Sequence, residues 1–548
     1  MSKEQKSVKY AGSFREQFTL RGMIIGGIGA VVLTTSSVYV ALKLGALPWP
    51  IIFVALVSMF ALKAMGNTNI NEINVTHTAM SAGAMVAGGL AFTIPGIWML
   101  DPTAHVDAGA LLVVTIGGVV LGLIFTALIK KYFVEEKELP YPMGIAAAET
   151  LVIGDEGGKK AIGLFASMGI SGLFTFFRDG LQLFPSALLN NTLLQKGVYG
   201  GIWLSPLMIA VGYIIGPLAI GIWFLGALIG DIGIVVGGTH FGFFDLGTAS
   251  SVKSSLGIGM MVGTGFGIVI KGILPKTKEI FGPMFSKERR NSGIVNLRWA
   301  PIAMVIVAFA FTVIAKMGLV ASIITILGVW VATAMSAQIT GQSGVNPMEI
   351  FGVIVLLAVK AVSNIGQIET FFVAAAVAVA CGLVGDVMND FKAGHILRSD
   401  SKAQWFAEAI GGIIGAFVAV GVIFLFFNAY GPEAFGSAEG FLAPQAATVA
   451  AMVGGISHVP AFAIGIVSGI LLYVLNLPVM TLGLGIYLPF YLSATAFIGG
   501  ALRFIVDRAA PNFEKEGTGL IIASGCLGGE AVVGVLIALW QLAVQMTA

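Results

Sequence analysis

The residues of this sequence that could do chemistry are ionisable side chains set inside long apolar runs. Ionisable groups at membrane depth are energetically costly, and they commonly mark substrate or proton pathways. Such groups are therefore candidates for carrying a proton or for binding a charged substrate. The most deeply placed are Glu149, Arg178, Asp179, Asp231, Glu349, Asp386, Glu408 and Glu530, and Glu72 and His77 lie at the start of the third apolar span.

Arg178 and Asp179 form the first notable pair. Adjacent residues do not share a helix face, so each is expected to need its own partner or a water-filled cavity. Arg178 is a candidate for binding a substrate carboxylate, and Asp179 for carrying a proton or pairing with a cation. The alternative interpretation is a structural network of ion pairs.

Glu72 and His77 stand together in the sequence, at the start of an apolar run. Five residues place them roughly 140° apart around a helix, so they are not expected to form a pair. His77 could be a proton relay or a metal ligand, or a structural histidine held by hydrogen bonds. Glu72 could carry a proton if it is buried, or it could simply be a carboxylate that the helix dipole favours.

Asp386 and Asp390 are four residues apart and therefore lie on one helical face, with Asn389 and Lys392 nearby. They occur where an apolar run ends, on the side expected to be cytoplasmic. The pair could form a gate or a point where a cation is admitted. A solvated helix end explains the same pattern equally well.

The composition requires these groups to lie in a membrane protein. Hydrophobic residues make up 57% of the chain and charged residues 11%, against about 25% charged in soluble domains. The 74 glycines suit close helix contacts and broken helices. Cys381 and Cys526 lie in apolar runs, which argues against a disulfide framework or a cysteine metal cluster.

Sequence patterns typical of other function classes are missing. The chain has no Walker loop, no His-Glu-x-x-His pattern and no evident Ser/His/Asp arrangement. It also has no repeated filter motif of the kind that channels often carry. We therefore expect neither an enzyme nor a channel, no cofactor, no bound metal and no nucleic-acid partner.

The apolar runs predict an all-α polytopic membrane protein with about sixteen transmembrane segments, because a span needs about 20 apolar residues. One long run, 201–237, is divided at Gly216-Pro217. Residues 478–501 could instead dip into the membrane and return. Residues 139–153 are too short to span and are flanked by charges, which predicts a re-entrant helix beside a cavity.

Lys and Arg residues set the expected orientation. They cluster in the tail, 1–21, and in a basic loop, 274–298, so both are expected to be cytoplasmic. An even number of crossings then separates them, and eight fits. The sequence thus predicts two transmembrane halves, 22–273 and 299–548, as parallel repeats. The pairs Leu139-Pro140 and Leu477-Pro478 are an internal echo of this repeat, or a chance recurrence.

Five segments, in order from about residue 70 to 530, resemble motifs of one transporter family. Asn71-Glu72-Ile73-Asn74-Val75 resembles its Gln-Glu-Asn-Thr-Val, and Leu139-Pro140-Tyr141-Pro142 with Gly144 resembles its Leu-Pro-Tyr-Pro-x-Gly. Residues 386–394 resemble its Asp-Leu-Met-Gln-Asp-Phe-Lys-Thr-Gly, and 488–492 its Val-Pro-Phe-Tyr-Leu. Residues 523–530 resemble its Ala-Ser-Gly followed by Gly-Asp-Gly. On these segments the chain resembles the oligopeptide transporter (OPT) family, near its yellow stripe-like branch.

The resemblance implies cation-driven import, usually with protons, of short peptides, peptide-like molecules or metal–chelator complexes. The chain departs from the plant pattern at Asn74, His77 and Glu530, and its short loops are typical of bacterial members. We therefore favour a peptide-like substrate, with metal-chelate import as the alternative. The expected location is the cell (inner) membrane, with a cytoplasmic N-terminus and membrane lipid around the chain. The oligomeric state stays open, with a homodimer among the options.

The sequence and the resemblance together give expected roles. Substrate binding is assigned to Arg178, Tyr141, Asn71 and Tyr491. Proton coupling is assigned to Glu72, Glu149, Asp179 and His77, and gating to Asp386 and Asp390. The two halves are expected to rock around a central cavity in alternating access.

Overall fold

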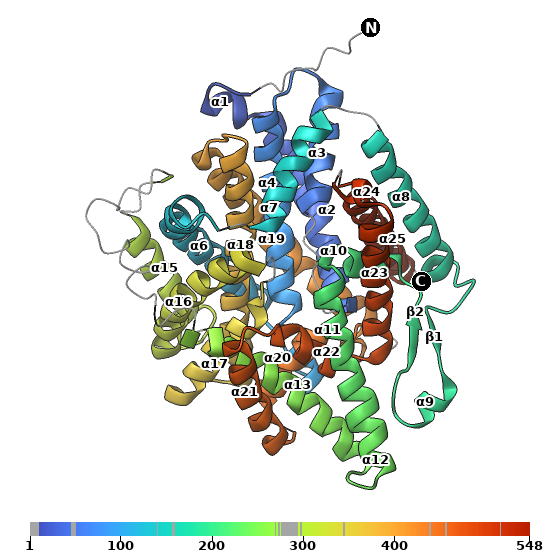
Figure 1. Ribbon diagram of the computed structural model, residues 1–548. Helices are drawn as coiled ribbons and strands as arrows, with labels where there is room; N and C mark the ends of the chain where they lie inside the picture. The colour runs from blue at the N-terminus through green and yellow to red at the C-terminus, as the bar shows by residue number, and fades with distance from the viewer. Residues whose placement is uncertain are drawn as a thin grey trace. The chain divides into compact units, whose positions relative to one another are not determined.

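A computed structural model describes most of the chain (Figure 1). The residues it describes are 10–44, 51–139, 141–155, 159–268, 270–271, 275, 294–295, 299–343, 346–437, 440–454, 457–515 and 517–547.

The chain forms two compact units, and each is built from two separate stretches of sequence. Unit 1 contains Met1–Ala161 and Lys276–Val453, and unit 2 contains Ile162–Pro275 and Gly454–Ala548. Each unit thus takes residues from both of the predicted halves, 22–273 and 299–548. The repeat relation between those halves stays a prediction.

The helical, membrane-embedded character is confirmed by the length and composition of the helices. Eight helices among the described residues are long and apolar enough to cross a membrane, and five shorter apolar helices accompany them. The exact count of about sixteen spans stays a prediction.

The regular elements that the structure describes in unit 1 are all helices. Its elements are α1 (Phe14–Gln17), α2 (Leu20–Leu44), α3 (Ile51–Met65), α4 (Ile70–Ala91), α5 (Gly96–Leu100), α6 (Ala108–Lys130), the π-helical η1 (Lys131–Glu136), α7 (Pro142–Asp155), α15 (Ala300–Val313), α16 (Leu319–Ser343), α17 (Met348–Val362), α18 (Gln367–Ile396), α19 (Ser401–Tyr430), the 3₁₀ turn η8 (Pro432–Ala434) and α20 (Pro444–Gly454).

The core of unit 1 is formed by α4 and α18, with α2, α6 and α19 packed against them. Every residue of α4 is buried. Its start is fixed by Asn69, whose side-chain oxygen accepts a hydrogen bond from the Glu72 amide at 2.8 Å. Helix α19 approaches α4 closely because Gly411 leaves room there: a Cβ atom on Gly411 would lie 2.1 Å from the Ala79 carbonyl oxygen.

The short segment at 139–153 forms helix α7, which packs against α3 and α18. Its 14 residues span about 21 Å, less than the roughly 30 Å of a bilayer core. The Gly144 amide donates to the Asn389 side-chain oxygen at 3.0 Å, which fixes α7 on α18. Pro140 and the Glu149 side chain lie outside the described residues, and the re-entrant path stays a prediction.

Unit 2 is helical apart from one small antiparallel sheet, β1 (Ala187–Leu189) paired with β2 (Gly201–Trp203). Its other elements are α8 (Lys159–Thr175), the π-helical η2 (Phe176–Gly180), α9 (Asn191–Gln195), α10 (Pro206–Ile215), α11 (Pro217–Ala227), the π-helical η3 (Leu228–Gly237), α12 (Gly238–His240), α13 (Leu246–Ile268), α21 (Val459–Val474), α22 (Val479–Tyr487), α23 (Phe490–Ala509), α24 (Pro511–Lys515) and α25 (Thr518–Thr547).

Two helix breaks in unit 2 have clear causes in the sequence. The predicted division at Gly216-Pro217 is confirmed: Gly216 has φ of +94°, a conformation that favours glycine, and Pro217 begins α11. A second break falls at Leu488-Pro489, where both residues have extended ψ angles between α22 and α23. The predicted segment 478–501 is therefore a broken helix whose second part continues to Ala509.

Candidate functional site

Unit 1 contains a buried group of carboxylates that come from two helices. Asp386 and Asp390 lie on α18, Glu408 lies on α19, and all three are 0% exposed. They offer carboxylate oxygens within 4.8 Å of one another. The idea that Asp386 and Asp390 form a solvated helix end is wrong, because α18 continues to Ile396 and buries both side chains.

His77 on α4 points at the same carboxylates. Its ring is 0% exposed, its Nε2 atom lies 3.4 Å from Asp390 Oδ1, and neither ring nitrogen has a hydrogen-bond partner in the described part of the chain. The described contacts therefore do not support the interpretation of His77 as a structural histidine held by hydrogen bonds. One turn further along α4, Ser81 donates to Asp390 Oδ2 at 3.1 Å. Asp386, Asp390, Glu408 and His77 are called the acid cluster below.

Neighbouring hydrogen bonds hold the helices that carry the acid cluster in place. The Gln404 side-chain nitrogen on α19 donates to the Asp390 carbonyl oxygen at 2.6 Å, and Asn389 bonds both the α18 backbone and α7. Glu408, Gly411 and Gly415 recur at helical spacing, so Glu408 lies on the α19 face that approaches α4 most closely.

The acid cluster has a specific electrostatic problem. Two negative charges 4.8 Å apart repel by roughly 3–4 kcal/mol at an effective dielectric constant of about 20. Among the described residues no donor forms a hydrogen bond of ordinary geometry with either oxygen of Asp386 or Glu408 or with Oδ1 of Asp390, although Asp386 interacts with Ser81 and Glu408 with Asp390. Such oxygens are neutralised by bound protons or by a cation, and both are ligands that a transport cycle can exchange.

Glu72 has a different environment, although it lies on the same helix as His77. Its carboxylate accepts two hydrogen bonds from Arg21 and one each from Thr19 and Thr68, all at 2.7 Å. The prediction that Glu72 and His77 do not pair is confirmed, since each faces its own partner. In this conformation Glu72 is already neutralised by Arg21.

Two residues expected to bind substrate in unit 1 have their polar atoms engaged by the protein. The Asn71 amide donates to the Leu397 carbonyl at 2.8 Å and to Ser399 Oγ at 3.1 Å. The Tyr141 hydroxyl donates to the Ala337 carbonyl at 3.0 Å. Both side chains are fully buried, and their substrate contacts stay a prediction.

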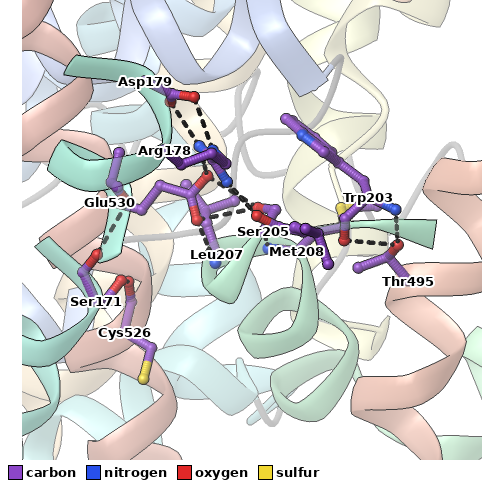
Figure 2. A network of polar contacts seen from close by, with 12 residues as sticks. Ser171, Arg178, Asp179, Trp203, Ser205, Leu207, Met208, Thr495, Cys526 and Glu530 are labelled. Atoms are coloured by element: carbon purple, nitrogen blue, oxygen red, sulfur yellow. Dashed lines mark hydrogen bonds and ion pairs between the residues drawn. The ribbon is translucent and has the colours of Figure 1, made fainter. Parts of the chain in front are cut away.

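Unit 2 contains a separate polar network centred on Arg178 (Figure 2). Its guanidinium donates to both Asp179 oxygens, at 2.7 and 2.6 Å, to Glu530 at 2.8 Å and to the Leu204 carbonyl. The expectation of separate partners is confirmed for Arg178, which binds Glu530, and is wrong for Asp179, because both of its carboxylate oxygens accept hydrogen bonds from Arg178.

Glu530 connects this network to the start of α10. Its carboxylate accepts from the Ser205 hydroxyl at 3.0 Å and from the Leu207 amide at 2.8 Å, while Ser205 also caps α10 by accepting from the Met208 amide. Figure 2 shows these groups converging on the carboxylate. These contacts agree with the alternative interpretation of Arg178 and Asp179, a structural network of ion pairs.

A second buried ion pair in unit 2 lies at the break between α22 and α23. Lys253 on α13 donates to Asp231 on η3 at 2.6 Å and to the Leu488 carbonyl at 3.3 Å. The nearby Tyr491 ring lies edge-on to Trp203, with centroids 6.4 Å apart. Sequence reasoning did not select Lys253, although it is a lone basic residue in the apolar, glycine- and serine-rich helix α13.

Comparison with known proteins gives a consistent assignment. The family model described as "OPT oligopeptide transporter protein" matches residues 17–541. A Haemophilus influenzae protein named as a provisional oligopeptide transporter is 24% identical, over 91% of this chain and 92% of its own length. The metal-nicotianamine transporter YSL2 of Arabidopsis thaliana is 41% identical, over 10% of this chain and 9% of its own length. The chain therefore belongs to the oligopeptide transporter family.

Proposed function

We propose that this protein imports short peptides or peptide-like molecules together with protons, by alternating access. Membership of a transporter family gives the class of activity, and we assign no enzymatic activity. The observation that carries the proton coupling is the acid cluster, where three buried carboxylates converge with no Lys or Arg paired to them in the described part of the chain.

Three other buried carboxylates differ in this respect, whereas Glu349 on α17 is buried without an ion pair in the described part of the chain but stands apart from the cluster. Glu72 pairs with Arg21, Asp231 with Lys253 and Glu530 with Arg178. In the described part of the chain no Lys or Arg pairs with Asp386, Asp390 or Glu408. A carboxylate without a fixed cation must be neutralised by a ligand that can leave, which is the property that ion-coupled transport requires.

The relatives support a peptide-like substrate. The Haemophilus influenzae protein, whose name refers to oligopeptides, matches along nearly its whole length. The plant transporter named for metal-nicotianamine matches over a short segment. Metal-chelate import is the second candidate, favoured by that segment.

The individual roles are proposals of differing strength. Among the coupling residues His77 is favoured, because it faces the acid cluster, whereas Glu72 would first have to leave Arg21. Asp179 would likewise have to leave Arg178, and Glu149 stays a candidate on α7. Arg178, Asn71 and Tyr141 could bind substrate only after exchanging their present partners, while Tyr491 lies half-buried at a helix break. Asp386 and Asp390 combine gating with coupling.

The location and assembly are part of the same proposal. We place the protein in the cell membrane with its N-terminus in the cytoplasm, from the Lys and Arg distribution. Labelling of single cysteines placed in the N-terminal tail from either side of the membrane tests the orientation. A homodimer would appear as a doubled protein mass in detergent.

Uptake into proteoliposomes tests the transport function. An acidic exterior should drive accumulation of labelled di- to pentapeptides, and a protonophore should abolish it. Counterflow, the exchange of labelled for unlabelled peptide, should continue without a pH gradient. Uptake that is indifferent to pH and to the protonophore would refute proton coupling, and uptake of metal chelates but not peptides would favour the second candidate.

A further inference from the structure

We infer that the acid cluster is the coupling-proton site, and that Asp386 and Glu408 each hold a proton there while Asp390 and His77 form a charged pair. This inference rests on the proposed function and goes further, since it assigns more than one proton to each transport cycle. It also gives a role to Glu408, which the family motifs around 386–394 do not include.

His77 is the observation that marks the cluster as a ligand site rather than a chance group of acids. It comes from a third helix, is fully buried, and aims its unbonded Nε2 atom at Asp390 Oδ1, 3.4 Å away. A buried imidazole without a hydrogen-bond partner is costly. A proton shared between Nε2 and the carboxylate removes this cost at Nε2, while Nδ1 keeps no hydrogen-bond partner among the described residues.

Asp390 is the carboxylate best able to keep a negative charge. Its Oδ2 accepts from Ser81 at 3.1 Å, and its Oδ1 faces His77. Hydrogen bonds to the charged form of a carboxylate favour that form. The pair of imidazolium and carboxylate is neutral overall, as a buried site requires.

Asp386 and Glu408 are in the opposite situation. Among the described residues neither side chain has an ion-pair partner, their polar contacts being with Ser81 for Asp386 and with Asp390 for Glu408, and both are 0% exposed. An ionised carboxylate in such a place costs several kcal/mol. Each is therefore neutral in this conformation, with one proton on each carboxyl group.

The charged residues on the surrounding helices do not change this assignment. Lys130 on α6 pairs with Glu135 and lies over the Phe391 ring, Lys402 at the start of α19 lies over Phe14, and Arg21 is held by Glu72. The remaining described charged side chains on elements packed against α18 and α19 are Lys43 (α2), Lys131 and Glu136 (η1), Glu349 and Lys360 (α17), Glu369, Lys392 and His395 (α18), and Glu433 (η8); the side chains of Glu149 and Asp155 (α7) are outside the described residues.

Loss of the two protons would leave three carboxylates facing one imidazolium. Because each pair of like charges within 4.8 Å adds repulsion of a few kcal/mol, the helices could not keep their present packing. Proton release is thus tied to a second conformation in which the cluster is open to water. This link is what couples a proton gradient to alternating access.

The proton-to-peptide ratio tests the inference. It is measured in proteoliposomes from the pH gradient that just balances a known peptide gradient. The wild type should give a ratio above one. Asp386→Asn and Glu408→Gln should each lower it by one proton, and the double variant should lose acid-driven uptake but keep counterflow. Glu349→Gln removes a buried carboxylate outside the cluster and should leave the ratio unchanged.

Infrared spectroscopy of purified protein gives a second measurement that does not depend on transport. The carbonyl stretch of a protonated carboxyl should lose one component in each single variant. Unchanged ratios and unchanged spectra in both variants would overturn the inference. So would stabilisation of the wild type by Zn²⁺ or Co²⁺ that both variants lose, since the cluster would then be a metal site. A wild type that shows counterflow but no acid-driven uptake would instead refute the proposed proton coupling.

Discussion

At the scale of single residues, a substitution at Glu72 tests whether this carboxylate is structural or couples protons to transport. Glu72→Gln removes the charge that four hydrogen bonds from Arg21, Thr19 and Thr68 surround. We expect a loss of about 1–3 kcal/mol in the free energy of unfolding, because Arg21 is partly exposed and its charge is partly screened. Thermal unfolding in detergent, followed by proteoliposome uptake, measures both effects.

The response of the Glu72→Gln variant to pH shows whether Glu72 has a structural role or a coupling role. If Glu72 serves mainly to anchor α4 to α2, the fraction that remains folded keeps its acid stimulation. A variant as stable as the wild type that no longer responds to pH would instead make Glu72 a coupling residue, as the sequence first indicated.

Arg178 makes a similar prediction in unit 2. Removing one partner of a buried ion pair costs about 3–5 kcal/mol, so Arg178→Met should strongly destabilise the protein. Adding Glu530→Gln should then cost less than the sum of the two single changes, because the pair contributes a coupling energy. Arg508→Met is the matched control, since Arg508 is exposed and lies over the Phe504 ring. Equal stability of both arginine variants, with weaker peptide binding only for Arg178→Met, would identify a substrate ligand.

The sequence predicts which residues are important better than it predicts what those residues contact. Glu72, His77, Asp386 and Asp390 stand out because charges in apolar runs are costly. Their partners could not be predicted, because Arg21 and Glu72 are 51 residues apart in the chain, and nothing local indicates that pairing. Glu408 stood out as a buried charge, but its role depends on α19 packing against α4.

At the scale of elements, the contact between α4 and α19 positions the acid cluster. Gly411→Ala would place a Cβ atom 2.1 Å from the Ala79 carbonyl oxygen, so the two helices would have to separate. Overpacking of this kind costs typically 1–3 kcal/mol. We expect a lower melting temperature together with weaker acid stimulation, because His77 and Glu408 lie on the helices that move apart.

Gly421 provides the control for this change on the same helix. A Cβ atom there would meet nothing within 4 Å, so Gly421→Ala should be neutral or slightly stabilising. If both alanine variants behave alike, close packing of α4 against α19 is not what holds the cluster together.

Helix breaks were partly predictable because they have local causes. Gly216-Pro217 combines a residue that permits positive φ with one that has no amide hydrogen, and the break occurs there. The β1–β2 sheet was not predicted. Its strands are three residues each and are as apolar as the helices around them, so hydropathy does not distinguish them.

At the scale of the whole molecule, each unit is assembled from two distant parts of the chain. In unit 1, α4 comes from the first part and its neighbours α18 and α19 come from the second. Hydropathy predicts helices but not which of them pack together, so the sequence favoured two halves divided at the basic loop. The interleaved units are still compatible with a repeat, since each half contributes one stretch to each unit.

This interleaving predicts how the protein behaves when it is cut. Fragments 1–284 and 285–548 each contain only part of either unit, so Asn71 and His77 on α4 would lose their partners Leu397, Ser399 and Asp390 in the first fragment. Lipid cannot replace those partners. We therefore expect each fragment alone to aggregate or be degraded, and co-expression to restore folded protein and peptide counterflow. A first fragment that is monodisperse and thermally stable by itself would show that the halves fold independently, and that the contacts across the cut contribute little.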